Sequence, residues 1–255
     1  MKPVVIIFGM MFISFGVAAC RGAVQTPLPE ITISYEDNAQ FELVSPAGTR
    51  VMVDVASPNV LSSPPTEKDI LLTTHSHDDH LNANFSDSFP GQQIKIEKGE
   101  IKLPDVSIFS IQGSHNSTPS PEEGNNYIFV IDMGGMRLAH FGDLGQDSLS
   151  EDQLEALGKV DVAFAQFANS YSSMDISNKK GFNLMDQVKP RLIFPTHVDE
   201  ETTQYAVEKW NGFYWDQASL QLSSADLGSE TSFLFLGKYA KGLGKIYNVP
   251  QWGSP

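Results

Sequence analysis

A short segment rich in histidine and aspartate has the residue types and spacing of a metal site. Its candidate ligands are His75, His77, Asp79 and His80. In an extended chain alternate side chains face the same way, so His75 and His77 can bring two imidazoles to one cation. Asp79 and His80 follow closely and can reach a second position nearby. Neutral imidazole and carboxylate suit Zn²⁺, and Mn²⁺ or iron can also use them.

The other three histidines lie at the ends of predicted strands. His115 and His197 each follow a strand, and His140 lies within another, three residues before Asp143. Strand ends carry functional side chains on a fixed framework, so we expect all six histidines to converge on one site.

Apolar runs separated by turn residues predict a chain rich in strands, with helices in its second half. Strands are predicted at residues 31–35, 39–44, 50–55, 70–74, 93–96, 106–111, 127–131, 137–141, 160–166, 192–194 and 232–236. Helices are predicted at residues 151–157, 182–188 and 202–210. Gly134 and Gly135 predict a hairpin turn with positive φ angles.

The first nineteen residues have the parts of a bacterial lipoprotein signal peptide. Lys2 precedes an apolar run at residues 4–17, which is shorter than a membrane span requires. The sequence Val-Ala-Ala-Cys that ends at Cys20, the single cysteine, resembles a lipobox. We therefore expect residues 1–19 to be removed and Cys20 to anchor the protein to a membrane by lipid. A short transmembrane anchor and an ordinary signal peptide cleaved after Ala19 are the alternatives.

The expected location is the bacterial cell envelope, on the periplasmic face of the outer membrane. Arg21 stands where an aspartate would signal retention in the inner membrane. Residues 20–30 contain Pro27 and Pro29 and are expected to form a tether. A folded domain at residues 31–237 and a tail at residues 238–255, which shows no clear pattern, complete the expected organisation.

The charge of the chain excludes one class of partner. The 255 residues carry a formal net charge of −14. A domain with this charge repels the phosphate backbone of DNA or RNA, so no nucleic-acid partner is expected. A small-molecule substrate is expected instead, and the sequence indicates no oligomeric state.

The order of the candidate ligands along the chain resembles the metallo-β-lactamase superfamily. The residues that carry the resemblance are the His75-x-His77-x-Asp79-His80 motif, His115, Asp143 and His197. The sequence from His140 to Gly145 is similar to that of small metal-dependent hydrolases related to ascorbate-6-phosphate lactonase. The resemblance implies an α/β fold, the αββα four-layer sandwich, and two divalent metal ions. Zn²⁺ is expected first, with Mn²⁺ or iron as alternatives.

The resemblance also implies a role for each ligand. The first metal position takes His75, His77 and His115; the second takes Asp79, His80 and His197; and Asp143 bridges the two. Asp54, at a strand end, is implied to hold the histidine segment in place.

Two bound cations predict a binuclear hydrolase. Cations about 3.5 to 4 Å apart can share a bridging hydroxide at neutral pH. The expected substrate is a small ester, lactone, amide or phosphodiester. Asp79 or Asp143 can act as catalytic carboxylates that hold a proton. His140 is not among the implied ligands. It either contacts substrate as a catalytic residue or anchors Asp143 as a structural partner.

Several alternatives remain open on the sequence alone. The membrane anchor also suits a phospholipase-like phosphodiesterase acting on membrane lipids, and a non-catalytic metal- or ligand-binding lipoprotein is the rival outside enzymes. The aromatic residues between Trp210 and Trp215 form either a pocket floor or part of the core. The polar segment 169–180 either lines a pocket or is an exposed loop. No cysteine stands among the candidate ligands, unlike the β-lactamases that have a cysteine ligand.

Overall fold

A computed structural model describes residues 1, 28–117, 125–237 and 240–253. The predicted signal peptide, Cys20 and most of the predicted tether lie outside the described residues. Among the helices that are described, none combines the length and the apolar composition needed to cross a membrane.

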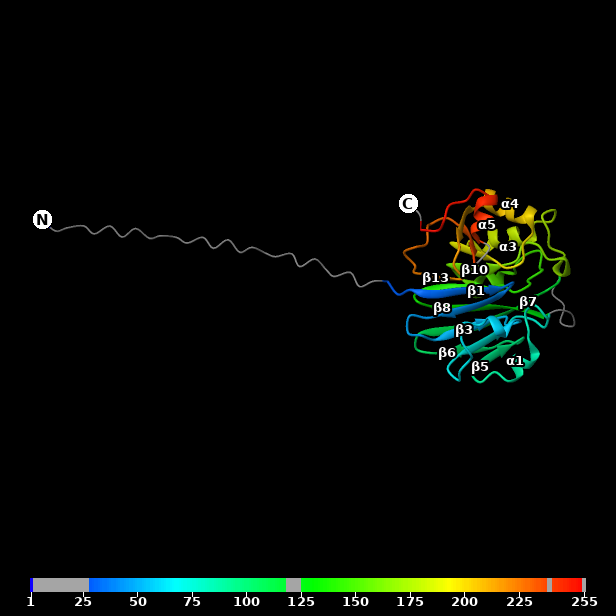
Figure 1. Cartoon of the computed structure of the whole chain (residues 1–255), viewed down its shortest axis with the longest axis horizontal. Helices are drawn as coiled ribbons and strands as arrows, with labels where there is room; N and C mark the ends of the chain where they lie inside the picture. Colours follow the sequence, from blue (N-terminus) through cyan, green and yellow to red (C-terminus); the bar gives the residue numbers. More distant parts are fainter. Residues whose placement is uncertain (2–27, 118–124, 238–239, 254–255) are drawn as a thin grey trace.

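Two β-sheets form the centre of the domain (Figure 1). The first sheet has the strand order β13-β1-β2-β3-β4-β5. Its strands β13, β1, β2 and β3 pair antiparallel, whereas β3, β4 and β5 pair parallel. The bounds are β1 Ile31–Asp37, β2 Gln40–Val44, β3 Arg50–Val53, β4 Ile70–Thr73, β5 Gln92–Lys95 and β13 Ser219–Leu222.

The second sheet has the strand order β12-β14-β11-β10-β9-β8-β7-β6. Strands β6 to β9 pair antiparallel, and the remaining pairs are parallel. Gly134 and Gly135 connect β8 and β9 with φ angles of 58° and 74°, so the predicted hairpin turn is confirmed. The bounds are β6 Glu100–Lys102, β7 Val106–Ser114, β8 Asn125–Met133, β9 Met136–His140, β10 Val162–Ala165, β11 Leu192–Pro195, β12 Asn211–Trp215 and β14 Ser232–Leu236.

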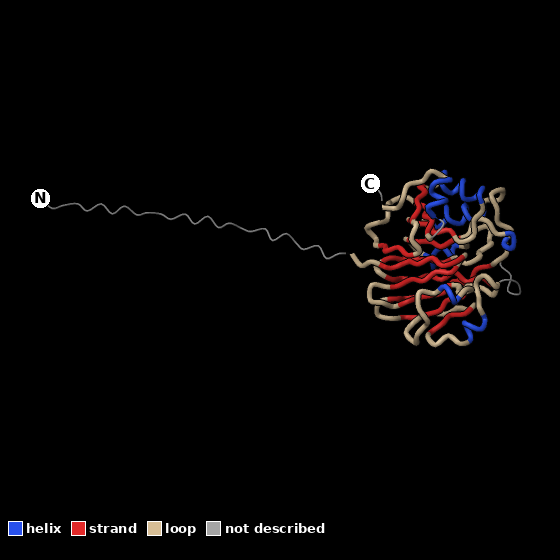
Figure 2. The backbone as a smooth tube through the Cα atoms, viewed as in Figure 1, coloured by secondary structure: helices blue, strands red, loops and turns tan. Residues whose placement is uncertain are grey.

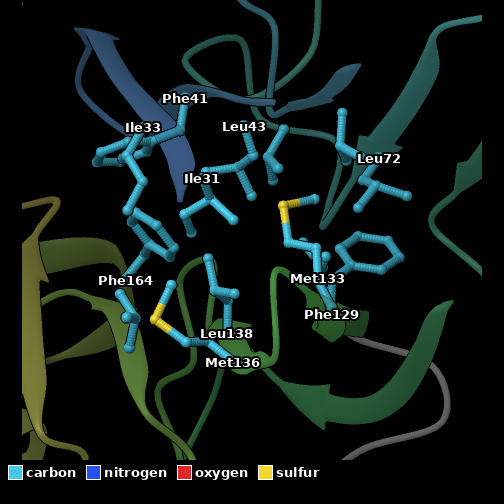
Figure 3. Packing of buried hydrophobic residues seen from close by; sticks show 14 of the residues in the cluster. Ile31, Ile33, Phe41, Leu43, Leu72, Phe129, Met133, Met136, Leu138 and Phe164 are labelled. Atoms are coloured by element: carbon cyan, nitrogen blue, oxygen red, sulfur yellow. The ribbon is translucent and has the colours of Figure 1, made fainter. Parts of the chain in front are cut away.

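The main core lies between the two sheets. Alternate residues of a strand face opposite sides, so Val51 and Val53 of β3 point into this core while Met52 points out. Figure 3 shows Ile33 and Phe41 from the first sheet facing Leu138 and Phe164 from the second. The sheets are thereby held face to face by apolar side chains from both.

Helices cover both outer faces (Figure 2). On the second sheet lie α2 Glu151–Leu157, α3 Lys180–Val188, α4 Glu200–Lys209 and α5 Ala240–Ile246. On the first sheet lies α1 Ala83–Asp87. Phe85 of this helix and Phe89, two residues after its end, pack against Met52 and Leu71. Short 3-10 turns occur at Pro58–Val60 and Ser170–Ser172. The expected αββα four-layer sandwich is confirmed.

Short edge elements were not predicted from the sequence. Strands β6, β12 and β13 and helices α1 and α5 fall outside the predicted ranges. Helix α5 contains two glycines, which disfavour helix, but Gly244 packs so closely on Tyr214 that a Cβ would lie 2.2 Å from its ring. Helix α5 packs against β12 and β14. This part of the chain, for which no element was predicted, is thus part of the fold.

Candidate metal centre

The candidate ligands follow strand ends along one edge of the sandwich. The segment that begins with His75 follows β4, His115 follows β7, Asp143 follows β9 and His197 follows β11. Strands β9, β10 and β11 are parallel, so their carboxyl ends meet at this edge. Loops at the carboxyl ends of parallel strands are the usual place for ligand sites in such sheets.

The structure brings all seven candidate ligands together in two groups. Within each group the potential ligand atoms lie within 4.8 Å of one another. The first group is His75, His77, His115 and Asp143, and the second is Asp79, His80 and His197. The histidines and Asp79 divide between the groups as the family resemblance implied, and Asp143, which was implied to bridge them, falls in the first group.

Asp143 lies between the two groups. Its Oδ2 is 3.4 Å from His115 Nε2 and 3.6 Å from His75 Nε2. Its Oδ1 is 3.1 Å from His80 Nε2 and 3.9 Å from His197 Nδ1. Each carboxylate oxygen therefore faces a different group of histidines, as a bridging carboxylate requires.

The loop that carries Asp143 is fixed by a glycine and a buried amide. Gly142 has φ +55°, and a Cβ there would lie 2.4 Å from Asn126 Oδ1 and 2.7 Å from Thr74 Oγ1, so a side chain does not fit. Asn126 accepts a hydrogen bond from the Asp143 backbone N–H at 2.9 Å and donates one to the Phe141 carbonyl at 2.8 Å. Both interactions hold Asp143 at the turn after β9.

Asp54 anchors the segment that begins at Thr74 through hydrogen bonds to Thr74 and His80. Its Oδ1 accepts a hydrogen bond from the Thr74 backbone N–H, and its Oδ2 accepts one from Thr74 Oγ1, both at 2.8 Å. Oδ2 also lies 2.7 Å from His80 Nδ1. Because Nδ1 is engaged by a carboxylate, the Nε2 atom of His80 is the one that faces the candidate site.

His140 is fully buried. Its Nδ1 accepts a hydrogen bond from the Gly142 backbone N–H at 3.2 Å, so its Nε2 carries the proton and donates to the Ala39 carbonyl at 3.0 Å. Burial lowers the pKa of His140, which keeps the ring neutral. Both ring nitrogens are therefore engaged by backbone groups, and neither is free to contact substrate.

Unpartnered polar atoms mark the centre as a cation site. Burying a polar atom without a hydrogen bond costs about 1 to 3 kcal/mol, so such atoms are rare unless a ligand satisfies them. Five buried atoms here have no partner among the described residues: His75 Nε2, His80 Nε2, His115 Nε2, His197 Nδ1 and Asp143 Oδ1. All belong to the two groups, so the residues present fit divalent metal ions.

The charges of the candidate ligands also suit a metal. Burial alone raises the pKa of Asp143, but His115 and His80 outweigh it and hold that pKa well below its usual range. A hydrogen bond with His197, at 3.0 Å, lowers the pKa of Asp79 to about 2. Burial lowers the pKa of His75 to about 3. At neutral pH these three side chains are in the forms that bind cations.

His80 behaves differently from the other ligands. Burial lowers its pKa, but the carboxylates of Asp54 and Asp143 outweigh this and raise the pKa of His80 to about 10. Its Nε2 must release a proton before it can bind a metal ion, so binding at the second group is coupled to proton release.

Sequence reasoning missed a polar contact from the segment 169–180. Asn169 Nδ2 donates a hydrogen bond to Asp143 Oδ2 at 2.7 Å. Tyr171, 78% exposed, lies with its ring centroid 5.7 Å from that of His77. This segment therefore borders the site. Asn169 follows β10 closely, and the strand-end argument used for the histidines could have identified it.

The aromatic residues between Trp210 and Trp215 lie on another part of the fold. Phe213 and Trp215 are partly buried against the core between the sheets, whereas Trp210 and Tyr214 pack against the helices. Of the two readings of this segment, the structure favours core.

Comparisons with known proteins agree with this arrangement. A model of the β-lactamase superfamily domain matches residues 32–197. A metal-dependent hydrolase of Thermococcus onnurineus is 23% identical over 195 residues, which cover 66% of this chain and 85% of that protein. A metal-dependent hydrolase of Thermoplasma acidophilum is 24% identical over 195 residues, which cover 68% of this chain and 85% of that protein.

Solved structures show the same fold. A Thermotoga maritima protein, described as a candidate Zn-dependent hydrolase of the metallo-β-lactamase superfamily, superposes with a TM-score of 0.61 and 20% identity, over 81% of this chain and 98% of that one. The metallo hydrolase Igni18 of Ignicoccus hospitalis superposes with a TM-score of 0.51 and 18% identity, over 71% of this chain and 91% of that one.

Proposed function

The chain belongs to the metallo-β-lactamase superfamily, and from this premise and the site geometry we propose that it is a binuclear metal-dependent hydrolase. The proposed substrate is a small ester, lactone, amide or phosphodiester. The single observation that carries the proposal is Asp143, whose two carboxylate oxygens face two different groups of histidines.

The proposed metal ligands are the two groups described above, with Asp143 shared between them. Histidine and carboxylate donors suit Zn²⁺ first, and Mn²⁺ or iron as alternatives. When bound, two such cations supply Lewis acidity and a hydroxide nucleophile at neutral pH.

Neighbouring residues hold the candidate ligands in position. Asn126 fixes the backbone of Asp143, and Asp54 engages Nδ1 of His80, so that Nε2 of His80 faces the centre. Asp79, with a side chain 42% exposed, is the more accessible carboxylate and suits a role in holding or passing a proton. We assign His140 a positioning role, since its ring bonds the backbone of Gly142, next to Asp143.

Two further parts of the proposal rest on the sequence. Similarity of the segment His140 to Gly145 supports a branch related to ascorbate-6-phosphate lactonase. Residues 1–20 support a lipid-anchored protein of the cell envelope, held at a membrane through Cys20.

Hydrolysis by the Zn-loaded protein tests the proposal. Phenyl acetate, a δ-lactone, an anilide and bis(p-nitrophenyl) phosphate represent the four proposed classes of bond. We expect turnover of at least one class, loss of turnover after treatment with dipicolinic acid, and recovery on adding Zn²⁺. Turnover that persists after chelation and in Asp143→Ala would contradict the proposal. Faster turnover of phospholipid vesicles than of every soluble substrate would favour the phosphodiesterase that acts on membrane lipids.

A further inference from the structure

A cavity of about 700 Å³ is lined by residues that flank the candidate ligand His197 in the chain. It occupies the carboxyl ends of β11 and β14 and extends to the hairpin between β1 and β2. Pro195, Thr196 and Val198 all contribute to its wall. The chain therefore passes from the cavity wall to the candidate ligand His197 and back to the wall within four residues. Its volume falls in the range of sites that hold small molecules.

The wall of this cavity is mainly apolar. Its apolar residues include Phe41, Phe194, Leu234, Leu236 and Leu243. Val60 and Val198 also line it and are 44% and 36% exposed, which places two large apolar side chains in contact with solvent at the cavity. Exposed apolar side chains that border a concave surface are typical of ligand sites.

The cavity carries little charge at neutral pH. Among the described residues of its wall, Glu36 is the single carboxylic acid, and no lysine, arginine or histidine is present. Burial, aided by a hydrogen bond with Glu42, raises the pKa of Glu36 to about 8. Burial raises the pKa of Glu42, but hydrogen bonds from Glu36 and Ser62, with the charge of Arg50 at 3.0 Å, outweigh it and lower that pKa, so Glu42 keeps its negative charge. Glu36 is therefore mostly uncharged at neutral pH, and the wall suits an uncharged group.

One polar atom of the wall residues has no partner. The hydroxyl of Thr196 is buried and makes no hydrogen bond to any described residue. Thr196 lines the cavity and directly precedes the candidate ligand His197 in the chain. A hydroxyl in this place can bond a polar atom of a ligand that spans the cavity and the metal centre.

We propose that this cavity binds the uncharged hydrocarbon group of an acyl substrate whose ester or amide bond lies at the metal centre. The inference rests on the proposed hydrolase function and narrows its substrate class. Burial of each added methylene in an apolar cavity raises binding about four-fold. Substrates with a medium-length acyl chain are thus expected to be preferred over acetyl compounds and over compounds with a charged acyl group.

Two measurements on the purified Zn-loaded protein test this assignment. The first is kcat/KM for p-nitrophenyl acetate, butyrate, octanoate and dodecanoate, which we expect to rise by about four-fold per methylene until the cavity is full. The second is binding of Nile red, an uncharged apolar dye, and its displacement by octanol. The second measurement does not depend on turnover.

Three variants test whether this cavity is responsible for the preference for acyl-chain length and for Nile red binding. Leu243→Trp and Val60→Trp add bulk to the cavity and should shift the preference to shorter esters and weaken Nile red binding at least five-fold. Ile246→Trp is the matched control, because Ile246 lies on α5 with Leu243 but is 70% exposed and does not line the cavity. Val60 is also partly exposed, so its variant is expected to fold even where Leu243→Trp does not.

The outcomes separate the inference from the proposed function. Ester hydrolysis that is independent of chain length, or equal effects of all three variants, would overturn the cavity assignment and leave the hydrolase function standing. Nile red binding that is weakened by Val60→Trp, with none of the four classes of bond hydrolysed, would overturn the hydrolase proposal and leave an apolar binding site. Acyl-length selectivity that is lost in the two cavity variants and kept in Ile246→Trp supports both.

Discussion

Asp54 Oδ2 lies 2.7 Å from His80 Nδ1, and both side chains are completely buried. The Asp54 backbone adopts φ +52°, a left-handed conformation that aspartate tolerates better than most residues. This turn directly after β3 lets one carboxylate bond both Thr74 and His80. The pair fixes the ring of His80 so that Nε2 is the nitrogen that faces the candidate metal centre.

Asp54→Asn is expected to weaken metal binding at the second group by about ten- to 100-fold. The amide keeps the size of the carboxylate but removes the charge that orients His80. Competition titration with a fluorescent Zn²⁺ chelator measures this affinity. Asp69→Asn is the control, because Asp69 is also a buried aspartate but pairs with Arg50 away from the centre. Equal affinities in the two variants would refute the orienting role.

Asp143→Ala and His140→Ala are expected to differ in metal content. Loss of Asp143 removes the carboxylate shared by both groups, so the variant should retain less than one Zn²⁺ per chain. His140→Ala should keep the wild-type metal content but lose roughly 2 to 4 kcal/mol of stability, because it leaves a cavity in a packed site. Elemental analysis and urea unfolding measure the two properties. Similar metal contents in the two variants would contradict the division between ligand and positioning residue.

Asn169→Ala is expected to lower the kcat of the Zn-loaded enzyme by about ten-fold or more. The amide of Asn169 donates a hydrogen bond to the Oδ2 atom of Asp143 at 2.7 Å, and such orienting contacts typically tune metal sites by this amount. Asn178→Ala serves as the control on the same segment, since Asn178 bonds only local backbone and Asp175. Steady-state kinetics on the best substrate compares them, and equal kcat values would exclude this role.

Glu36→Gln is expected to change how stability depends on pH. The pKa of Glu36 is about 8 in the folded protein against 4.5 for an ordinary glutamate, so the folded state binds its proton more tightly. This contribution is full below pH 4.5 and is lost as the pH rises through about 8. The stability of Glu36→Gln relative to wild type should therefore increase by roughly 1 kcal/mol between about pH 6 and about pH 9. Urea unfolding at both pH values measures it, and a constant difference would contradict the raised pKa.

The sequence predicted the candidate metal ligands better than the residues that contact them. His75, His77 and His80 could be grouped because a strand and a turn fix their relative directions over a few residues. His115 and His197 could be added because both follow strands. Spacing separated Asp79 and His80 from His75 and His77, and the family resemblance assigned His115, Asp143 and His197.

The remaining contacts join segments that are far apart in the sequence, so no local sequence pattern predicts them. Asn126 and Asn169 reach Asp143 from β8 and from the loop after β10, and an asparagine near a strand end resembles an ordinary turn residue. Strands β12 and β13 lie at sheet edges, where pairing with β14 and β1 decides the structure more than local pattern. The cavity lined by residues that flank His197 in the chain is likewise built from residues distant in sequence.

Anomalous diffraction from a crystal of the Zn-loaded protein tests the central claim most directly. Two zinc peaks are expected about 3.5 to 4 Å apart, one beside each carboxylate oxygen of Asp143. The first should contact His75, His77 and His115, and the second Asp79, His80 and His197. A single peak, or zinc bound by residues outside these groups, would contradict the account.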